Sequence, residues 1–165
     1  MYIEKYWGEY IGGSDDSLNL LAFLEDQKEY EISLSEIFSR IGLDRQNWNF
    51  RQTVDDLGFI HSTGVEIDFH FAIDMITDIV AVLLESLVSD GINLHDLDEY
   101  DTSFKYIRIT ATPEQYKALD TALMDFTQNP LAYDISELIG DNEIKEMAHQ
   151  VEEVRKDLYL YTISN

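Results

Sequence analysis

The sequence predicts a single α+β domain in which helices dominate, packed around one central helix with a small, mostly antiparallel sheet. Three observations lead to this prediction. Of the 165 residues, 45% are hydrophobic and 12% aromatic, a composition that forms a folded core despite a formal net charge of -22. Helical and extended patterns both occur, without the regular alternation of βαβ units. No linker or repeat divides the chain, so we expect one domain over residues 1–165.

The N-terminal segment is predicted to be a strand followed by a helix. Residues 2–10 are rich in Tyr, Ile and Trp, which favours a strand that ends at the flexible pair Gly12 and Gly13. Ser14 then provides an N-cap for a short amphipathic helix. The acidic residues 15 and 16 come next and interact favourably with the positive end of the helix dipole.

A second short helix and an irregular segment follow. The spacing of Ser33 and Glu36 is that of a capping box, and Gly42 supplies a left-handed stop about two turns later. Residues 44–62 contain several turn-forming residues and no clear period. They are therefore predicted to be a loop with at most one strand.

The most strongly patterned element spans residues 68–90 and is predicted to be the buried central helix. Its polar residues, together with Glu66, fall within one narrow arc of a helical wheel, and the remaining positions are mostly apolar. A helix with so narrow a polar face is buried on most sides. Its aliphatic side chains are expected to form the centre of the core: Ile73, Ile76, Ile79, Val80, Leu83 and Leu87.

The last third of the chain is predicted to contain two strands and two long helices. Residues 104–110 alternate apolar and polar side chains as a half-buried strand does. Thr112 begins a helix with a capping box. A short turn of helix near residues 134–137 and an amphipathic helix over residues 141–157 come next. Residues 158–163 are expected to form a final strand.

The charge of the chain is concentrated in residues 52–104, which carry twelve acidic side chains and no Lys or Arg. Such a block projects a negative potential and favours a positively charged partner, whereas binding to nucleic acid or to anionic membranes is electrostatically opposed. The absence of cysteine excludes disulfides and a cysteine nucleophile. The N-terminus lacks the pattern of a secretory signal, and acids interrupt the longest apolar run. We therefore expect a cytoplasmic protein.

The acidic residues of this block are divided between one helix face and one loop, which together form the predicted contact surface. Like charges one helical turn apart, such as Asp74 and Asp78, are destabilising unless a cation offsets them. Residues that are kept against local stability often serve a site. The predicted partner-binding residues are Glu66, Asp74, Asp78, Glu85, Asp96, Asp98, Glu99 and Asp101.

The helix face also admits a metal-site interpretation. Glu66, His70 and Asp74 follow one another at i, i+4 spacing, which lets carboxylate and imidazole groups converge on a metal ion. A metal-dependent hydrolase built on these three residues is therefore an alternative hypothesis. A solvated acidic face is the simpler interpretation, because helical metal sites usually take matching ligands from a second helix and the sequence offers none. We predict no cofactor, no resident metal and no catalytic residues.

Two segments carry a resemblance to a known class of proteins. Residues 6–18 (YWGEYIGGSDDSL), the apolar positions that follow them, and residues 64–70 (GVEIDFH) resemble the opening half of small bacterial immunity proteins. Such proteins belong to polymorphic toxin and contact-dependent growth inhibition systems. The resemblance implies a cytosolic protein that binds and neutralises one cognate toxin domain, and it assigns no functional residues.

The charge and the resemblance lead to the same hypothesis. A nuclease toxin must bind phosphate with Lys and Arg, so an acidic immunity protein is suited to occlude its basic groove. The partner is then a basic, nuclease-type toxin domain, with no contact to nucleic acid or membrane. An acidic adaptor or regulatory domain of a larger assembly is the remaining alternative.

Overall fold

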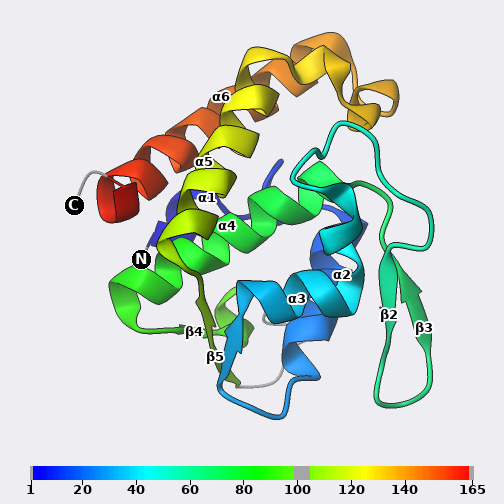
Figure 1. Ribbon diagram of the computed structural model, residues 1–165, viewed down its shortest axis with the longest axis vertical. Coiled ribbons are helices and arrows are strands. Elements are labelled where there is room, and N and C mark those ends of the chain that lie inside the picture. Colours follow the sequence, from blue (N-terminus) through cyan, green and yellow to red (C-terminus); the bar gives the residue numbers. More distant parts are fainter. Residues whose placement is uncertain (1, 99–104, 164–165) are drawn as a thin grey trace.

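Helices dominate the computed structural model, which describes residues 2–98 and 105–163 of the chain (Figure 1). Together with two small sheets they give the α+β class that the sequence predicts. The helices are α1 (Tyr2–Tyr6), α2 (Asp15–Glu25), α3 (Leu34–Ile41), α4 (Ala72–Ser89), α5 (Pro113–Gln128) and α6 (Asp141–Leu158).

The strands form one mixed sheet and one hairpin. In the first sheet β5 lies between β1, which runs parallel to it, and β4, which runs antiparallel. In the second, β2 and β3 pair as an antiparallel hairpin. Most of these pairings are antiparallel, as predicted. The strands are β1 (Glu31–Ser33), β2 (Gly58–Ile60), β3 (Glu66–Asp68), β4 (Ile92–Asn93) and β5 (Tyr106–Thr110).

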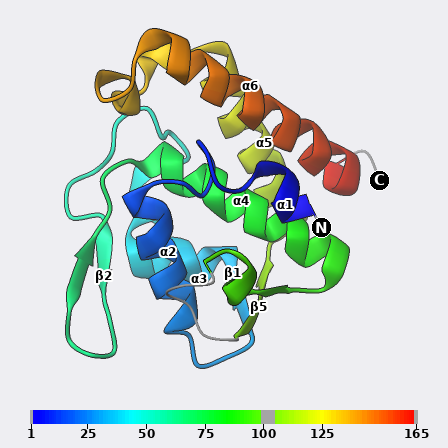
Figure 2. The same cartoon turned by 180° about the vertical axis from the view of Figure 1, so that it is seen from behind.

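Helix α4 crosses the middle of the molecule and is the centre of the core. It is packed between the α5–α6 pair on one side and α2 and β5 on the other, and α1 lies against it at the back (Figures 1 and 2). Every side chain from Ala72 to Ser86 is buried, which confirms the predicted central helix. Leu87 is an exception among the predicted core residues. Its side chain is 41% exposed because the last turn of α4 reaches the edge of the molecule.

The structure corrects the start of this helix. The helix is predicted to start near residue 68, but residues 66–68 form β3 and α4 begins at Ala72. The reason lies outside the helix. The backbone N–H groups of His70 and Phe71 donate to the side chain of Asp16, which fixes this part of the chain ahead of the helix. The helical pattern of the sequence therefore extends beyond the helix itself.

Both predicted terminal strands are wrong. Residues 2–6 form α1, because Ile3 and Tyr6 are three positions apart and both become buried on one helical face. At the other end α6 runs to Leu158, and Tyr159–Ile163 continues as a π-helical turn. The Thr162 hydroxyl donates to the carbonyl of Leu158, which holds this turn to the helix. Aromatic and aliphatic residues favour a strand locally, but packing against the rest of the protein makes both terminal segments helical.

Helices α2, α3 and α5 begin where their capping residues predict. The Ser14 side chain accepts from the backbone N–H of Ser17 at the start of α2. The Ser33 side chain caps α3, which ends at Gly42 with a φ of 102°. Thr112 and Gln115 form the capping box of α5. β5 also lies where it is predicted, so the interior of the chain follows its local signals.

Candidate interaction surface

Two glycines shape the segment between α1 and α2. A Cβ on Gly12, whose φ is 80°, would lie 2.2 Å from the Trp7 ring. A Cβ on Gly13 would lie 2.0 Å from the backbone oxygen of Glu9. Only glycine therefore permits this close turn. The turn carries Ser14 to the side of α4.

Two carboxylates of α4 are bound by this segment. The Ser14 hydroxyl donates to Asp74 Oδ2 over 2.6 Å. The Ser17 hydroxyl donates to Asp78 Oδ2 over 2.6 Å, and the backbone N–H of Gly12 donates to Asp78 Oδ1 over 2.7 Å. These hydrogen bonds join segments about sixty residues apart and satisfy buried oxygens that would otherwise be costly.

A third carboxylate, that of Asp16, caps the N-terminus of α4 from another element. It accepts the backbone N–H groups of His70 and Phe71, each over 2.9 Å, and it lies 3.2 Å from His70 Nδ1. The N-cap residue of α4 is Phe71, which provides no side-chain cap of its own. The sequence associates Asp16 only with α2, because a cap supplied from a distant segment leaves no local signal.

Burial changes the protonation of the two α4 aspartates. It raises the pKa of Asp74 to about 6, with the charge of Asp16 adding to the effect and the Ser14 hydrogen bond opposing it. Burial raises the pKa of Asp78 well above its ordinary value, and the neighbouring Asp74 charge raises it further. The buried pair therefore binds protons more tightly than surface aspartates do.

The predicted acidic stripe consists of Glu66, Asp74, Asp78 and Glu85 on one face of the central helix. The structure overturns the prediction that this stripe is exposed to solvent. Asp74 is 3% exposed, and Asp78 and Glu85 are 0% exposed. The polar arc is covered because residues 12–17 lie over it and offer hydroxyl and amide donors to Asp74 and Asp78. Most of the predicted stripe is therefore part of the interior.

The other predicted contact residues lie apart from this arc. Glu66 is exposed on β3, Asp96 is exposed on a short helical turn after β4, and Asp98 is partly exposed. Glu99 and Asp101 lie outside the described residues. A role in partner binding stays a prediction for all of these positions.

The geometry behind the hydrolase alternative is also different from that expected. Glu66 belongs to a strand and His70 precedes α4, so they do not share a helical face with Asp74. His70 Nδ1 instead lies against Asp16. Among residues 2–98 and 105–163, no three His, Asp or Glu side chains are grouped so that they could hold a metal ion.

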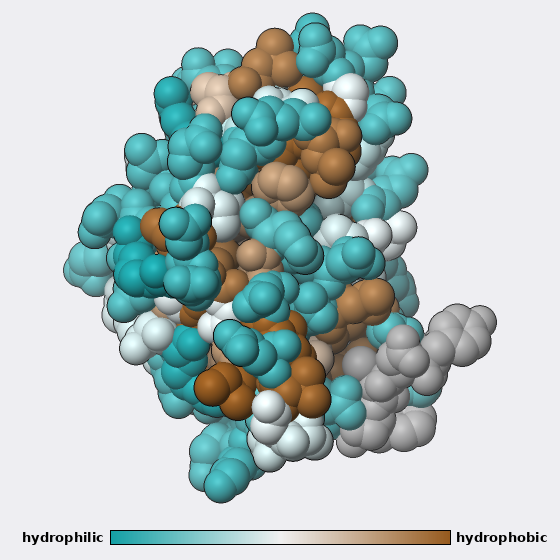
Figure 3. Space-filling model, turned by 90° about the vertical axis from the view of Figure 1, so that its right-hand side faces the viewer, coloured by the Kyte–Doolittle hydropathy of each residue, from teal (hydrophilic) through white to brown (hydrophobic). Residues whose placement is uncertain are grey.

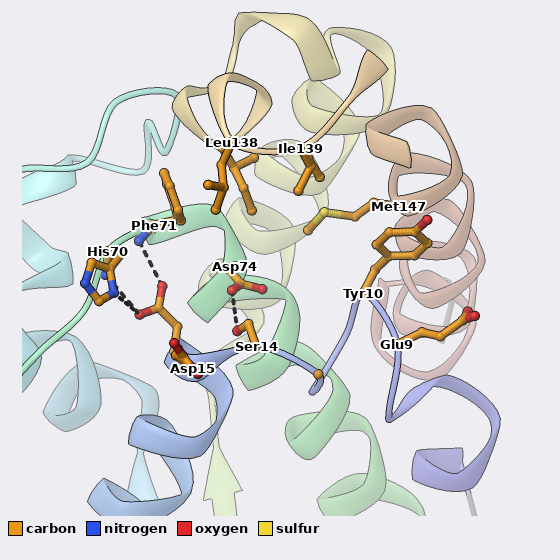
Figure 4. Close-up of a pocket in the computed structure, with 13 residues that line it drawn as sticks. Glu9, Tyr10, Ser14, Asp15, His70, Phe71, Asp74, Leu138, Ile139 and Met147 are labelled. Atoms are coloured by element: carbon orange, nitrogen blue, oxygen red, sulfur yellow. Dashed lines mark hydrogen bonds and ion pairs between the residues drawn. The ribbon is translucent and has the colours of Figure 1, made fainter. Parts of the chain in front are cut away.

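A pocket of about 490 Å³ opens beside the buried carboxylates (Figure 4). Residues 9–16, the start of α4, the turn before α6 and α6 itself contribute to its walls. Figure 4 shows Asp74 and Ser14 between the apolar side chains of Phe71 and Leu138 above and those of Tyr10 and Met147 to one side. Because these walls come from distant segments, the sequence alone does not reveal the pocket.

Exposed apolar side chains occur at the pocket and elsewhere. On the face shown in Figure 3, brown apolar surface lies in separate patches among teal polar side chains. Leu138 at the pocket is 71% exposed, and Ile60 and Val65 on the β2–β3 hairpin are 72% and 58% exposed. Exposed apolar groups next to polar ones are typical of contact surfaces.

The exposed acids at the pocket have no Lys or Arg partner within the described part of the chain, whereas the buried Asp16 faces His70. Glu9 accepts a hydrogen bond from Gln150, Glu146 accepts one from the Tyr10 hydroxyl, and Asp15 is exposed. No Lys or Arg lines the pocket in the part of the chain that the structure describes. This region therefore keeps uncompensated negative charge.

Several arginines neutralise acids in other places. Arg51 Nη2 lies 2.7 Å from Asp125 Oδ1, and its guanidinium holds the pKa of that carboxyl at about 2. Arg108 and Arg155 each contact two carboxylates outside the pocket: Glu31 and Asp90, and Asp120 and Glu152. The pocket is therefore a candidate for contact with a basic partner, because exposed acids line it and no Lys or Arg of the described residues does.

Comparison with families of known proteins identifies the family of this chain. The family model described as Immunity protein 68 matches residues 2–158. The chain belongs to the Immunity protein 68 family. No curated protein and no solved structure gives a significant match. As a member of the Immunity protein 68 family, the chain is an immunity protein of a toxin system, which confirms the class that its sequence resembles. In the described residues of this Immunity protein 68 member, no helix has the length and apolar character needed to cross a bilayer.

Proposed function

We propose that this immunity protein neutralises a cognate toxin by binding it directly and covering a basic, nucleic-acid-binding groove. The observation that carries the proposal is the pair of exposed acids at the pocket, Glu9 and Asp15, which have no Lys or Arg partner among the described residues. The formal charge of -22 also favours a positively charged partner. The protein works by occlusion and performs no chemistry on the toxin.

Electrostatic complementarity explains why such a surface suits a nuclease. A nuclease holds phosphate groups with Lys and Arg, so its groove carries the opposite sign. Complementary potentials steer the two proteins together and raise the association rate above that of neutral pairs. An acidic inhibitor then occupies the place of the nucleic acid.

The proposed contact surface is centred on the pocket. Glu9 and Asp15 contribute its exposed charge, and Leu138 contributes exposed apolar area. Glu66 and Asp96 extend the acidic surface as the sequence predicts. The side chains of Asp78 and Glu85 are fully buried, so these two residues lie outside the proposed contact surface. The proposed contact surface is therefore centred on the pocket rather than on the polar face of α4, and acidic side chains still provide its charge.

The proposal is tested by co-expressing the protein with its cognate toxin and by measuring association of the purified pair at several salt concentrations. We expect rescue of growth and an association rate that falls by an order of magnitude or more between about 50 mM and 500 mM salt, because screening shortens the reach of the charges. An association rate that is equal at low and high ionic strength would contradict a basic partner.

A further inference from the structure

We propose that the pocket between residues 9–16 and residues 135–139 receives an arginine side chain of the toxin, an inference that rests on the proposed function. The pocket combines an apolar wall, a group of carboxylates and one buried carboxylate with a free acceptor (Figure 4). The first two match the two halves of an arginine side chain. The third gives its cation a specific partner.

The apolar wall matches the methylene stem of an arginine. Phe71, Leu138, Ile139 and Met147 line this side of the pocket. Arginine buries its stem along such surfaces while its charged end reaches polar groups. The volume of about 490 Å³ lies within the range of sites that hold small molecules, so one side chain fits with space for water. Leu138 is 71% exposed, which leaves the wall accessible from outside.

Acidic residues at the edges of the pocket supply negative charge. Glu9 and Asp15 line the pocket at two separate edges, and Tyr10 offers an aromatic face on the side of Glu9 and Met147. A guanidinium group is attracted both by carboxylates and by the face of an aromatic ring. The Tyr10 hydroxyl donates to Glu146 over 3.0 Å, which places a further carboxylate beside this ring.

Asp74 distinguishes this pocket from an ordinary acidic patch. Its side chain is 3% exposed, and Ser14 donates to Oδ2. No hydrogen bond reaches Oδ1 from any described residue, and Figure 4 shows that this oxygen points away from Ser14 toward the side of Tyr10 and Met147. Asp74 Oδ1 is not one of the sealed, unsatisfied atoms of the described residues, so a donor that enters the pocket can reach it. A cation in the pocket would provide both the donor and the opposite charge.

Arginine fits these groups better than lysine does. Its planar guanidinium presents five N–H donors that can contact Asp74 and a second carboxylate at once, whereas an ammonium group is compact and more strongly hydrated. Arginine is also enriched among the residues that dominate the binding energy of interfaces. The pocket is therefore assigned as an anchor point within the larger electrostatic surface.

The test uses the free, ¹⁵N-labelled full-length protein and N-acetyl-arginine amide as the probe. Heteronuclear NMR should show saturable shifts of the backbone amides of Ser14, Phe71 and Ile139. The uncharged isostere N-acetyl-citrulline amide should bind at least about tenfold more weakly, because it lacks the charge-assisted hydrogen bond. Shifts that spread over the whole acidic surface without saturation, or equal binding of citrulline, would overturn the proposal.

Two variants and one matched control make the test specific. Asp74→Asn keeps an acceptor for Ser14 but removes the charge, and it should weaken arginine binding about tenfold. Leu138→Ser changes an exposed position that folding does not need, and it should weaken binding severalfold through the lost apolar contact. Glu114→Gln removes an exposed charge at the start of α5, far from the pocket, and should leave binding unchanged. Equal binding by wild type, Asp74→Asn and Leu138→Ser would overturn the assignment.

The same variants separate this inference from the proposed function. With the toxin, Asp74→Asn should raise the dissociation rate about tenfold and leave the association rate nearly unchanged, because a buried contact acts on dissociation. If toxin binding depends on salt but the arginine probe does not shift the pocket amides, the arginine site is wrong and the proposal of a basic partner still holds. Toxin binding that does not respond to salt would overturn the basic partner, whatever the arginine probe shows.

Discussion

Asp15 and Asp16 are neighbours in the sequence and have opposite environments in the structure. Both residues line the pocket, but Asp16 is 2% exposed and caps α4 through two backbone N–H groups, whereas Asp15 is exposed. The same contrast separates the buried pair Asp74 and Asp78 from the exposed Glu9. Acidic residues therefore serve two purposes here. Those inside hold the N-terminal segment to α4, and those outside supply charge to the surface.

The formal charge counted from the sequence is more negative than the charge on the surface of the protein, because some of the acidic residues are buried. Burial raises the pKa of both Asp74 and Asp78, so the interior pair carries less negative charge than two surface aspartates. The interior acids are tolerated because hydroxyl and amide donors reach them. The exposed acids Glu9 and Asp15 have no Lys or Arg partner among the described residues, so a partner is expected to supply the positive charge.

The largest effect is expected from Asp78→Ala. This change removes the acceptor of Ser17 and of the Gly12 N–H and leaves a cavity, so the free energy of unfolding should fall by about 2–4 kcal/mol. Asp15→Ala, at an exposed position, should cost less than about 1 kcal/mol. Urea denaturation of both variants measures the difference. Similar losses for the two variants would remove the distinction between interior and surface acids.

The pH dependence of stability gives the next effect. The pKa of Asp74 rises from 3.8 to about 6 on folding, so the folded state keeps a proton that the unfolded state releases. The resulting stabilisation is fully present below about pH 4 and is lost as the pH rises through about 6. A shift of this size corresponds to roughly 2–3 kcal/mol at 1.36 kcal/mol per pKa unit.

Asp74→Asn isolates this contribution because asparagine does not titrate. Between pH 4.5 and pH 7.5, the stability of the wild type should fall relative to that of the variant by about 2 kcal/mol. The control Asp15→Asn should show a much smaller change with pH. A constant difference between wild type and Asp74→Asn over this range would show that burial does not perturb the Asp74 carboxyl.

A smaller effect is expected from reversing an exposed charge at the pocket. Asp15→Lys should slow association with the toxin about three- to tenfold at low salt, because it weakens the attraction that guides the encounter. The matched change Glu114→Lys alters net charge equally but lies on α5, so its effect should be smaller. Stopped-flow association at low and high salt measures both. Equal effects would mean that only net charge matters and that the pocket is not the centre of the interface.

Features that neighbouring residues determine are predicted correctly from the sequence, whereas features that distant segments determine are not. Ser14, Ser33 and Thr112 predict helix starts because a cap acts within one turn, and the apolar periodicity of α4 predicts its burial. The terminal strands are wrong because packing against α4 and the continuation of α6 decide those segments. No local pattern tells whether Asp78 faces water or a serine from a segment sixty residues away. The interior and surface acids therefore cannot be separated from the sequence.

The smallest effect is expected at the acids that the sequence predicts away from the pocket. Glu66→Lys on β3 and Asp96→Lys after β4 should each slow toxin association by about twofold or less at low salt, because exposed charges outside the contact centre act only through the long-range field. Dissociation rates should not change. If either variant slowed association more than Asp15→Lys, or raised the dissociation rate, the hairpin or the loop would form the centre of the interface. The sequence-based site would then describe the contact surface better than the pocket does.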